Sequence, residues 1–473
     1  MKTRKGYTTY PLTVSQKFHN YYAGATEHKE ILNIGTTLTI EFELDVDELR
    51  NAVYKAYQRS EFMRVRFAYD KTEDEWYQYV VSEDDMGFSP EDIEYVDFSS
   101  QTMEYADEVM TKWTRTPFVQ EDSQMNKVVI IKNPDGFQGI FLMGDHRLID
   151  AQSLIVFMKD VIELYCSKMF EGVPYPSEMT SYIKQLEKDI AYENNSKQQQ
   201  KDREYFYKLI DESEPIFNGI EGTARLDETR KVFKDKSLRY AVGASDSIVA
   251  AIDTFSLEAD ATEQLMKFCE EQHISLQVLL IMGIRTYFQK FNNNDDVSMQ
   301  VSYARRATLM EKKSGGTRIH CFPFRTVIPR DMSFLDALKV IRTGQNETFR
   351  HVNLNPVEYM GYRAKKYKVN PGCTYESISL TYQPATLKQN GLGKNIEGIN
   401  YKTKRYGNGV YSDGIYLSVM HRPDDNGLDF LFEHQIKAYT TPMIEYFYYY
   451  LCKIMFKGIE RPNLTVGEII DLV

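Results

Sequence analysis

A histidine and an aspartate, His146 and Asp150, lie four residues apart in the stretch Met-Gly-Asp-His-Arg-Leu-Ile-Asp-Ala at 143–151. The apolar run at 139–142 is typical of a buried strand, and the apolar spacing over 152–169 predicts a helix. We therefore expect His146 in a loop that regular elements hold at both ends, a common place for chemistry. An imidazole there can accept a proton near neutral pH, because its ordinary pKa is about 6.5. A single histidine in such a loop is also compatible with packing alone.

Strands and helices alternate on both sides of this loop. Residues 35–44 alternate between apolar and polar side chains, which predicts a half-buried strand, and a helix capped by Asp45 or Asp47 should follow to about Arg59. Similar reasoning predicts helices at 103–114, 260–272, 275–291, 334–351 and 440–456, and strands at 62–69, 76–82, 127–131, 137–143, 248–257, 297–303, 376–382, 414–421 and 428–433. This mixture predicts an α+β fold of mixed, layered sheets.

A strongly polar stretch at 177–213 separates two halves of similar build. Its helical propensity and its charge predict a solvated connection between two lobes. We expect an N-terminal lobe at 1–176 that carries the His146 loop, and a C-terminal lobe at 177–473 that begins with this polar helical linker.

The composition excludes several classes of function. The 473 residues carry a formal net charge of −11 with no basic block, which argues against a nucleic-acid or anionic-membrane surface. Five widely spaced cysteines form no C-x-x-C pair, so we expect buried free thiols in a reducing compartment, with no zinc site. No apolar run is long enough to cross a bilayer, and the N-terminus lacks the apolar core of a signal peptide, so we expect a cytoplasmic protein.

The order of several short motifs resembles the condensation domains of nonribosomal peptide synthetases, in the superfamily of chloramphenicol acetyltransferase. The family pattern H-H-x-x-x-D-G falls on 145–151, where His146 and Asp150 are kept, Asp145 replaces the first His and Ala151 replaces the Gly. The other matching segments are Ser-Gln-Lys-Phe at 15–18, Arg-Ser-Glu-Phe-Met-Arg-Val-Arg-Phe at 59–67, Ala-Arg-Arg at 304–306, Cys-Phe-Pro-Phe-Arg-Thr at 321–326 and Asn-Leu-Asn-Pro-Val-Glu at 353–358.

The resemblance implies two lobes in a V around a central channel, with segments near 312–330 and 380–400 bridging them. It gives His146 the central catalytic place, as a base or as a positioning group. It also implies an ion pair between Asp150 and Arg306, although H-x-x-x-D spacing alone would suit a carboxylate that orients the imidazole. Tyr382 and Gln383, at a strand's end, would line the channel.

The sequence also suggests structural roles for Asp145 and His320, and a local effect of Ala151. Consecutive side chains of an extended segment point to opposite faces, so we expect Asp145 to face away from the substrate and to support the loop. His320 should also be structural. Ala151 lacks the backbone freedom of glycine, which predicts a somewhat different turn into the helix.

In this family an acceptor amine or hydroxyl attacks an acyl or aminoacyl thioester, so the resemblance implies no resident cofactor. Peptidyl or acyl carrier proteins would deliver the substrates on phosphopantetheine arms, and a small-molecule acceptor is an alternative. The sequence contains neither an adenylation-type ATP loop nor a carrier-type Gly-Gly-x-Ser, so we expect a freestanding unit whose carriers come from other chains.

Two other functions stay open. The first is a coenzyme A-dependent O- or N-acyltransferase of the same superfamily. The second is a catalytically silent scaffold that recruits carrier proteins, which the replaced His and Gly of the motif would suit.

Overall fold

The computed structural model describes residues 2–194, 196–384 and 400–473. Within these residues the chain forms two compact units. Unit 1 extends to Ser196 and also contains Ala304–Ile319 and residues 400–409. Unit 2 contains Lys197–Tyr303, His320–Pro384 and Val410–Val473.

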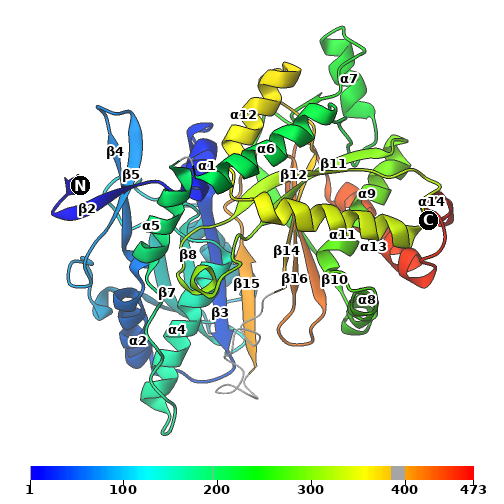
Figure 1. Ribbon diagram of the computed structural model, residues 1–473. Helices are drawn as coiled ribbons and strands as arrows, with labels where there is room; N and C mark the ends of the chain where they lie inside the picture. Colours follow the sequence, from blue (N-terminus) through cyan, green and yellow to red (C-terminus); the bar gives the residue numbers. More distant parts are fainter. Residues whose placement is uncertain (1, 195, 385–399) are drawn as a thin grey trace. The chain divides into compact units, whose positions relative to one another are not determined.

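A five-stranded sheet forms the centre of unit 1 (Figure 1). Its neighbouring strands run antiparallel except for the parallel pair β6 and β7. In spatial order the strands are β15 (Tyr401–Tyr406), β3 (Asn33–Ile40), β8 (Gln138–Asp145), β7 (Asn126–Lys132) and β6 (Tyr95–Asp97). Every residue of β8 is buried, so its last residue leads from the core directly into the His146 loop.

Helices cover both faces of this sheet, and alternation along β7 shows how. Val128 and Ile130 belong to the cluster shared with α2 and α4, whereas Val129 and Ile131 belong to the cluster shared with α3. The helices of unit 1 are α1 (Val14–Gly24), α2 (Val46–Arg59), α3 (Met103–Thr114), α4 (Ala151–Met169), α5 (Tyr182–Glu193) and α10 (Leu309–Lys313). Asp45 caps α2 through the Asp47 and Glu48 backbone N–H groups, as its sequence predicts.

A smaller antiparallel sheet completes unit 1. In spatial order it contains β1 (Thr3–Arg4), β2 (Tyr7–Pro11), β5 (Glu75–Val80) and β4 (Val65–Asp70). The short 3₁₀ turns of this unit are η1 (Lys29–Leu32), η2 (Glu61–Arg64) and η3 (Pro90–Asp92).

Unit 2 is built on a six-stranded mixed sheet with the order β10 (Ala250–Leu257), β17 (Leu428–Gln435), β16 (Ile415–His421), β14 (Ile378–Gln383), β11 (Asp296–Tyr303) and β12 (His320–Val327). A two-stranded ladder pairs β13 (Cys373–Thr374) with β9 (Ala241–Val242). The helices are α6 (Lys197–Glu212), α7 (Ala224–Val232), α8 (Ala259–Glu271), α9 (Leu276–Asn292), α11 (Phe334–His351), α12 (Pro356–Tyr367), α13 (Thr441–Glu460) and α14 (Val466–Leu472). The apolar helix α9 supplies the largest share of the core.

Most of the long predicted elements are present within a few residues, among them α3, α4, α9 and α11. The sequence did not predict β15 or α12, and the strand expected at 35–44 ends at Ile40. Unit 1 keeps α5 and extends to Ser196, which is past the lobe boundary expected at residue 176. The two segments expected to bridge the lobes both have parts in unit 1, and residues 385–399 of the second lie outside the described residues.

Three further observations concern the described residues alone. No helix among them is long and apolar enough to cross a membrane. No cluster of three or more His, Cys, Asp or Glu side chains in these parts of the chain could hold a metal ion. All five cysteines are unpaired, but only Cys166 and Cys269 are buried, so the expectation of buried thiols is wrong for the other three.

Candidate active site

The loop that carries His146 joins β8 to α4 through five residues. β8 ends at Asp145 and α4 begins at Ala151. The His146 backbone N–H donates to the Leu32 carbonyl at 2.7 Å, and the Leu148 backbone N–H donates to the Asp145 carbonyl at 2.8 Å. These bonds fix the backbone on both sides of the histidine, so strand β8 sets the place from which the imidazole projects.

Asp150 is a buried acceptor that joins the loop, helix α4 and the segment Ala304–Ile319. It caps α4 by accepting the Ser153 backbone N–H at 2.9 Å, and Arg306 Nη2 lies 2.8 Å from each of its oxygens. The Arg318 backbone N–H donates to the same carboxylate at 2.9 Å. Burial alone would raise the pKa of Asp150, but Arg306 and the Ser153 donors bring it below its ordinary value.

The ion pair expected between Asp150 and Arg306 is therefore present. Both side chains are more than nine-tenths buried, and no hydrogen bond joins Asp150 to His146 among the described residues. The neighbouring Arg305 has a left-handed backbone (φ 49°) and donates to the Ser15 hydroxyl at 2.9 Å, so it is Arg306 that reaches the aspartate. Asp150 thus holds the loop in place, and it does not orient the imidazole.

Asp145, which replaces the first His of the family motif, pairs with Arg147 inside unit 1. Arg147 Nε and Nη2 each donate to one oxygen of the Asp145 carboxylate at 2.9 Å, and the Arg147 backbone N–H adds a third bond at 2.8 Å. The guanidinium also donates to Asn20 at 3.1 Å and lies over the Phe67 ring. Both charged groups are almost fully buried, so the pair fixes the residues on either side of His146.

His146 stacks on a second histidine, His19 of α1. The ring centroids are 4.1 Å apart and the planes differ by 19°. His19 is 7% exposed, whereas His146 is partly exposed. Among the described residues, Nδ1 of His146 and Nε2 of His19 have no hydrogen-bond partner.

The surroundings favour the neutral form of both rings. Burial lowers the pKa of His146, and the opposing effect of Asp150 does not reverse this. Burial holds the pKa of His19 well below its ordinary value, and the nearby His146 and Arg147 act in the same direction. A neutral imidazole with an unpaired nitrogen can accept a proton or a hydrogen bond from a nucleophile.

Two of these residues were not predicted from the sequence. Arg147 lies in the turn two positions after Asp145, and two opposite charges so near each other in the chain were a signal that the sequence contained. His19 lies 127 positions before His146 in the chain, and no local pattern connects them.

The remaining predicted residues lie in unit 2. Tyr382, near the end of β14, shares a hydrogen bond of 2.9 Å with Nε2 of His421, and Gln383 is the last residue of the same strand. His320 is fully buried at the start of β12, where its Nδ1 lies 2.7 Å from the Val352 carbonyl oxygen. This contact is typical of a histidine with a structural role. The channel-lining place of Tyr382 and Gln383 stays a prediction.

Comparison with known proteins decides the family. The family model described as Condensation domain matches residues 7–471. The chain belongs to the condensation-domain family. Surfactin synthase subunit 1 of Bacillus subtilis (strain 168) is 20% identical over 472 residues, which are 98% of this chain and 12% of that protein. Bacitracin synthase 3 of Bacillus licheniformis is 20% identical over 441 residues, 92% of this chain and 6% of that protein. This condensation domain thus spans a small part of the length of these relatives.

Solved structures of condensation domains share the fold. The starter condensation domain of rhizomide synthetase RzmA, in a mutant form in complex with C8-CoA, has a TM-score of 0.79 at 15% identity, with 97% of each chain covered. VibH, a condensation enzyme of nonribosomal peptide synthesis, has a TM-score of 0.70 at 15% identity, with 94% of this chain and 96% of that chain covered. The expected mixed α/β fold of this family is therefore confirmed.

Proposed function

We propose that this condensation domain joins an acyl or aminoacyl thioester to an amine or hydroxyl acceptor. The observation that carries the proposal is the loop between β8 and α4, where a neutral, partly exposed His146 lies between two buried ion pairs. A scaffold without chemistry would not require an imidazole with an unpaired nitrogen at this place, because leaving a buried polar atom unpaired costs stability.

The proposed reaction is acyl transfer. The acceptor nitrogen or oxygen attacks the thioester carbonyl, the new C–N or C–O bond forms, and the C–S bond breaks. The acceptor's proton passes to His146 and then to the departing thiolate, so the donor arm leaves as a free thiol. General-base assistance of this kind contributes roughly 10²- to 10⁴-fold to the rate.

The donor we propose is a thioester on a phosphopantetheine arm, carried by a peptidyl or acyl carrier protein. Coenzyme A ends in the same arm, and the RzmA domain was solved with C8-CoA, so a free coenzyme A thioester is the second candidate donor. The Asp145–Arg147 pair supports an active enzyme over the silent scaffold, because the replaced motif residue still holds the loop through buried bonds.

The test is intact-protein mass spectrometry of donor and acceptor carriers from the same gene neighbourhood. We expect wild-type protein to move the donor mass to the acceptor, and His146→Ala to slow this at least about 10²-fold. His28→Ala is the matched control, because His28 is an exposed histidine whose imidazole pairs with Glu30. It should transfer at the wild-type rate.

Three results would contradict parts of the proposal. Equal transfer by wild type and His146→Ala would remove His146 from the mechanism. Transfer from acyl-coenzyme A, with none from any carrier pair, would replace the carrier by the free thioester as donor. If a folded protein transferred no acyl group from either donor, the catalytically silent scaffold would remain as the function.

A further inference from the structure

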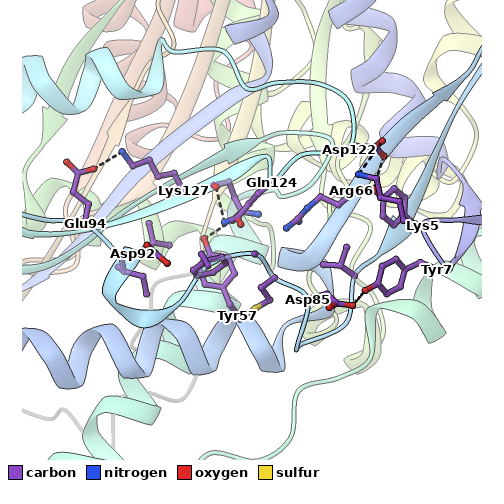
Figure 2. Close-up of a pocket in the computed structure, with 18 residues that line it drawn as sticks. Lys5, Tyr7, Tyr57, Arg66, Asp85, Asp92, Glu94, Asp122, Gln124 and Lys127 are labelled. Atoms are coloured by element: carbon purple, nitrogen blue, oxygen red, sulfur yellow. Dashed lines mark hydrogen bonds and ion pairs between the residues drawn. The ribbon is translucent and has the colours of Figure 1, made fainter.

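Unit 1 contains a cavity whose lining includes none of residues 145–151. It has a volume of about 780 Å³ and lies among the β4–β5 sheet, α2, the start of β7 and residues 85–94 (Figure 2). Small-molecule sites usually measure roughly 300–1,000 Å³. The cavity is therefore large enough for a ligand of that kind.

An arginine that has no carboxylate partner among the residues the structure describes lines this cavity. Arg66 of β4 is 6% exposed, and the only hydrogen bond of its guanidinium among the described residues runs from Nη1 to the Val65 carbonyl at 3.0 Å. Burial lowers the pKa of Arg66; the nearby Tyr79 and Tyr57 oppose this without reversing it, and Arg64 acts in the same direction as burial. Arg64 is itself buried and donates to the carbonyls of Tyr57, Gln58 and Val81. A buried charge in a protein is normally paired with an opposite charge, and among the described residues Arg66 has no such partner.

The acidic side chains of the lining are already engaged elsewhere. Asp122 accepts from Arg4 and from the Tyr79 hydroxyl, and Lys5 lies 3.5 Å from it.

The other three acidic side chains of the lining also have partners. Lys127 pairs with Glu94 at 2.8 Å, and Figure 2 draws this pair. The others, Asp85 and Asp92, accept from Tyr7 and from the Ser89 backbone N–H, respectively. Among the described residues, Arg66 is therefore the one cation of the lining that has no acidic partner.

Apolar and aromatic groups form another part of the wall. Met86 is buried, and Phe88 packs edge-on against Tyr57 with ring centroids 5.1 Å apart. Val81 and Val128 also line the cavity. A ligand there would meet one unpaired guanidinium and a wall that suits a hydrophobic body.

We propose that this cavity binds a small organic monoanion, whose carboxylate pairs with Arg66 and whose apolar body packs against Met86 and Phe88. The planar fork of a guanidinium matches the two oxygens of a carboxylate. The single unpaired cation favours one negative charge, because the four acidic side chains of the lining would repel a dianion. The site lies outside the His146 loop, so this inference does not depend on the proposed reaction.

The first test uses 4-fluorobenzoate as the probe and 4-fluorobenzamide as its neutral counterpart. Ligand-observed ¹⁹F NMR of the full chain should show binding of the benzoate, with the benzamide at least about tenfold weaker, since a charge-assisted bond is lost. Arg66→Gln should weaken the benzoate about tenfold or more and leave the benzamide unchanged. Arg66→Lys should lie between, because it keeps the charge and loses the fork.

The Arg66 variants should fold, because no described carboxylate pairs with Arg66 and so none loses its cation when the guanidinium is removed. We expect the melting temperature of Arg66→Gln without ligand to equal or exceed that of wild type. Arg350→Gln is the matched control, because Arg350 of helix α11 lies outside the cavity and forms an exposed pair with Glu347, and its benzoate affinity should stay within about twofold of wild type. Equal binding of benzoate and benzamide, or an unchanged affinity in Arg66→Gln, would overturn the proposal.

A second measurement does not depend on any variant. Crystals of the wild-type protein soaked with 4-bromobenzoate should show an anomalous bromine peak inside the cavity, with the carboxylate at Arg66. No peak in the cavity, or the carboxylate at another group, would contradict the assignment.

Discussion

At the scale of single residues, the candidate site is a histidine whose pKa is lowered by burial and which lies between two buried ion pairs. Asp150 pairs with Arg306 and Asp145 pairs with Arg147, and neither carboxylate is directed to the imidazole. Removing one member of a buried pair usually costs much more than the pair contributes, because a charge is left uncompensated. The loop therefore depends on both members of each pair.

The stacked histidines make stability depend on pH in a predictable direction. The unfolded chain protonates His19 as the pH falls below about 6.5, whereas burial lowers the pKa of His19 in the folded state, so acid favours unfolding. Such a group removes up to about 1.4 kcal/mol of stability per pH unit between the two pKa values.

We therefore expect the free energy of unfolding of wild type to fall between pH 6.5 and pH 5, and to fall less steeply in His19→Leu. Urea unfolding at several pH values measures both slopes. Identical slopes in the two proteins would show that His19 is protonated equally in the folded and unfolded states.

At the scale of elements, the turn after α10 holds Arg306 and α4 together. Gly316 has a left-handed backbone (φ 74°), and a Cβ added there would lie 2.5 Å from the Tyr182 ring. Its carbonyl accepts from Arg306 at 2.7 Å and also from the Ser153 hydroxyl. A side chain at this position would strain the backbone and displace the partner of Asp150.

Gly316→Ala should lower the free energy of unfolding by at least about 1–2 kcal/mol, from the left-handed backbone alone. Gly361→Ala is the matched control, because it lies in helix α12 and no atom lies within 4 Å of the added Cβ. It should gain about 0.5–1 kcal/mol from helix propensity. Urea unfolding measures the free energy of unfolding of both variants. If Gly316→Ala were as stable as Gly361→Ala, the claim that the turn requires glycine at position 316 would be contradicted.

At the scale of the whole molecule, unit 1 is assembled from distant parts of the chain. β15 pairs with β3 along its length, and Ala304–Ile319 supplies the partner of Asp150. Without these segments β3 becomes a bare sheet edge, and a buried carboxylate loses its cation.

A fragment of residues 1–196 should therefore fail to fold alone, with collapsed amide dispersion in NMR spectra and no cooperative unfolding transition. Co-expression with residues 197–473 should restore a soluble complex with dispersed resonances. Cooperative unfolding of the isolated fragment would show that the inserted segments are dispensable.

The sequence alone determined the local elements and the position of the loop. Apolar spacing predicted α3, α4 and α9, and the motif order indicated His146 and the Asp150–Arg306 pair through the resemblance. These features follow from the spacing of apolar residues and of motif residues, which can be read from short segments of the chain. The unit boundary and strand β15 were not predicted, because they depend on pairings between segments far apart in the chain.

Only the tertiary structure decided what surrounds the histidine. It brought His19 against His146 across 127 positions and gave Asp145 a partner in Arg147. It also left Arg66 without a carboxylate partner among the described residues, in a cavity whose acidic side chains have other partners. Periodicity assigns a residue to a face, but which groups meet there depends on how distant surfaces pack, and a linear pattern does not contain that information.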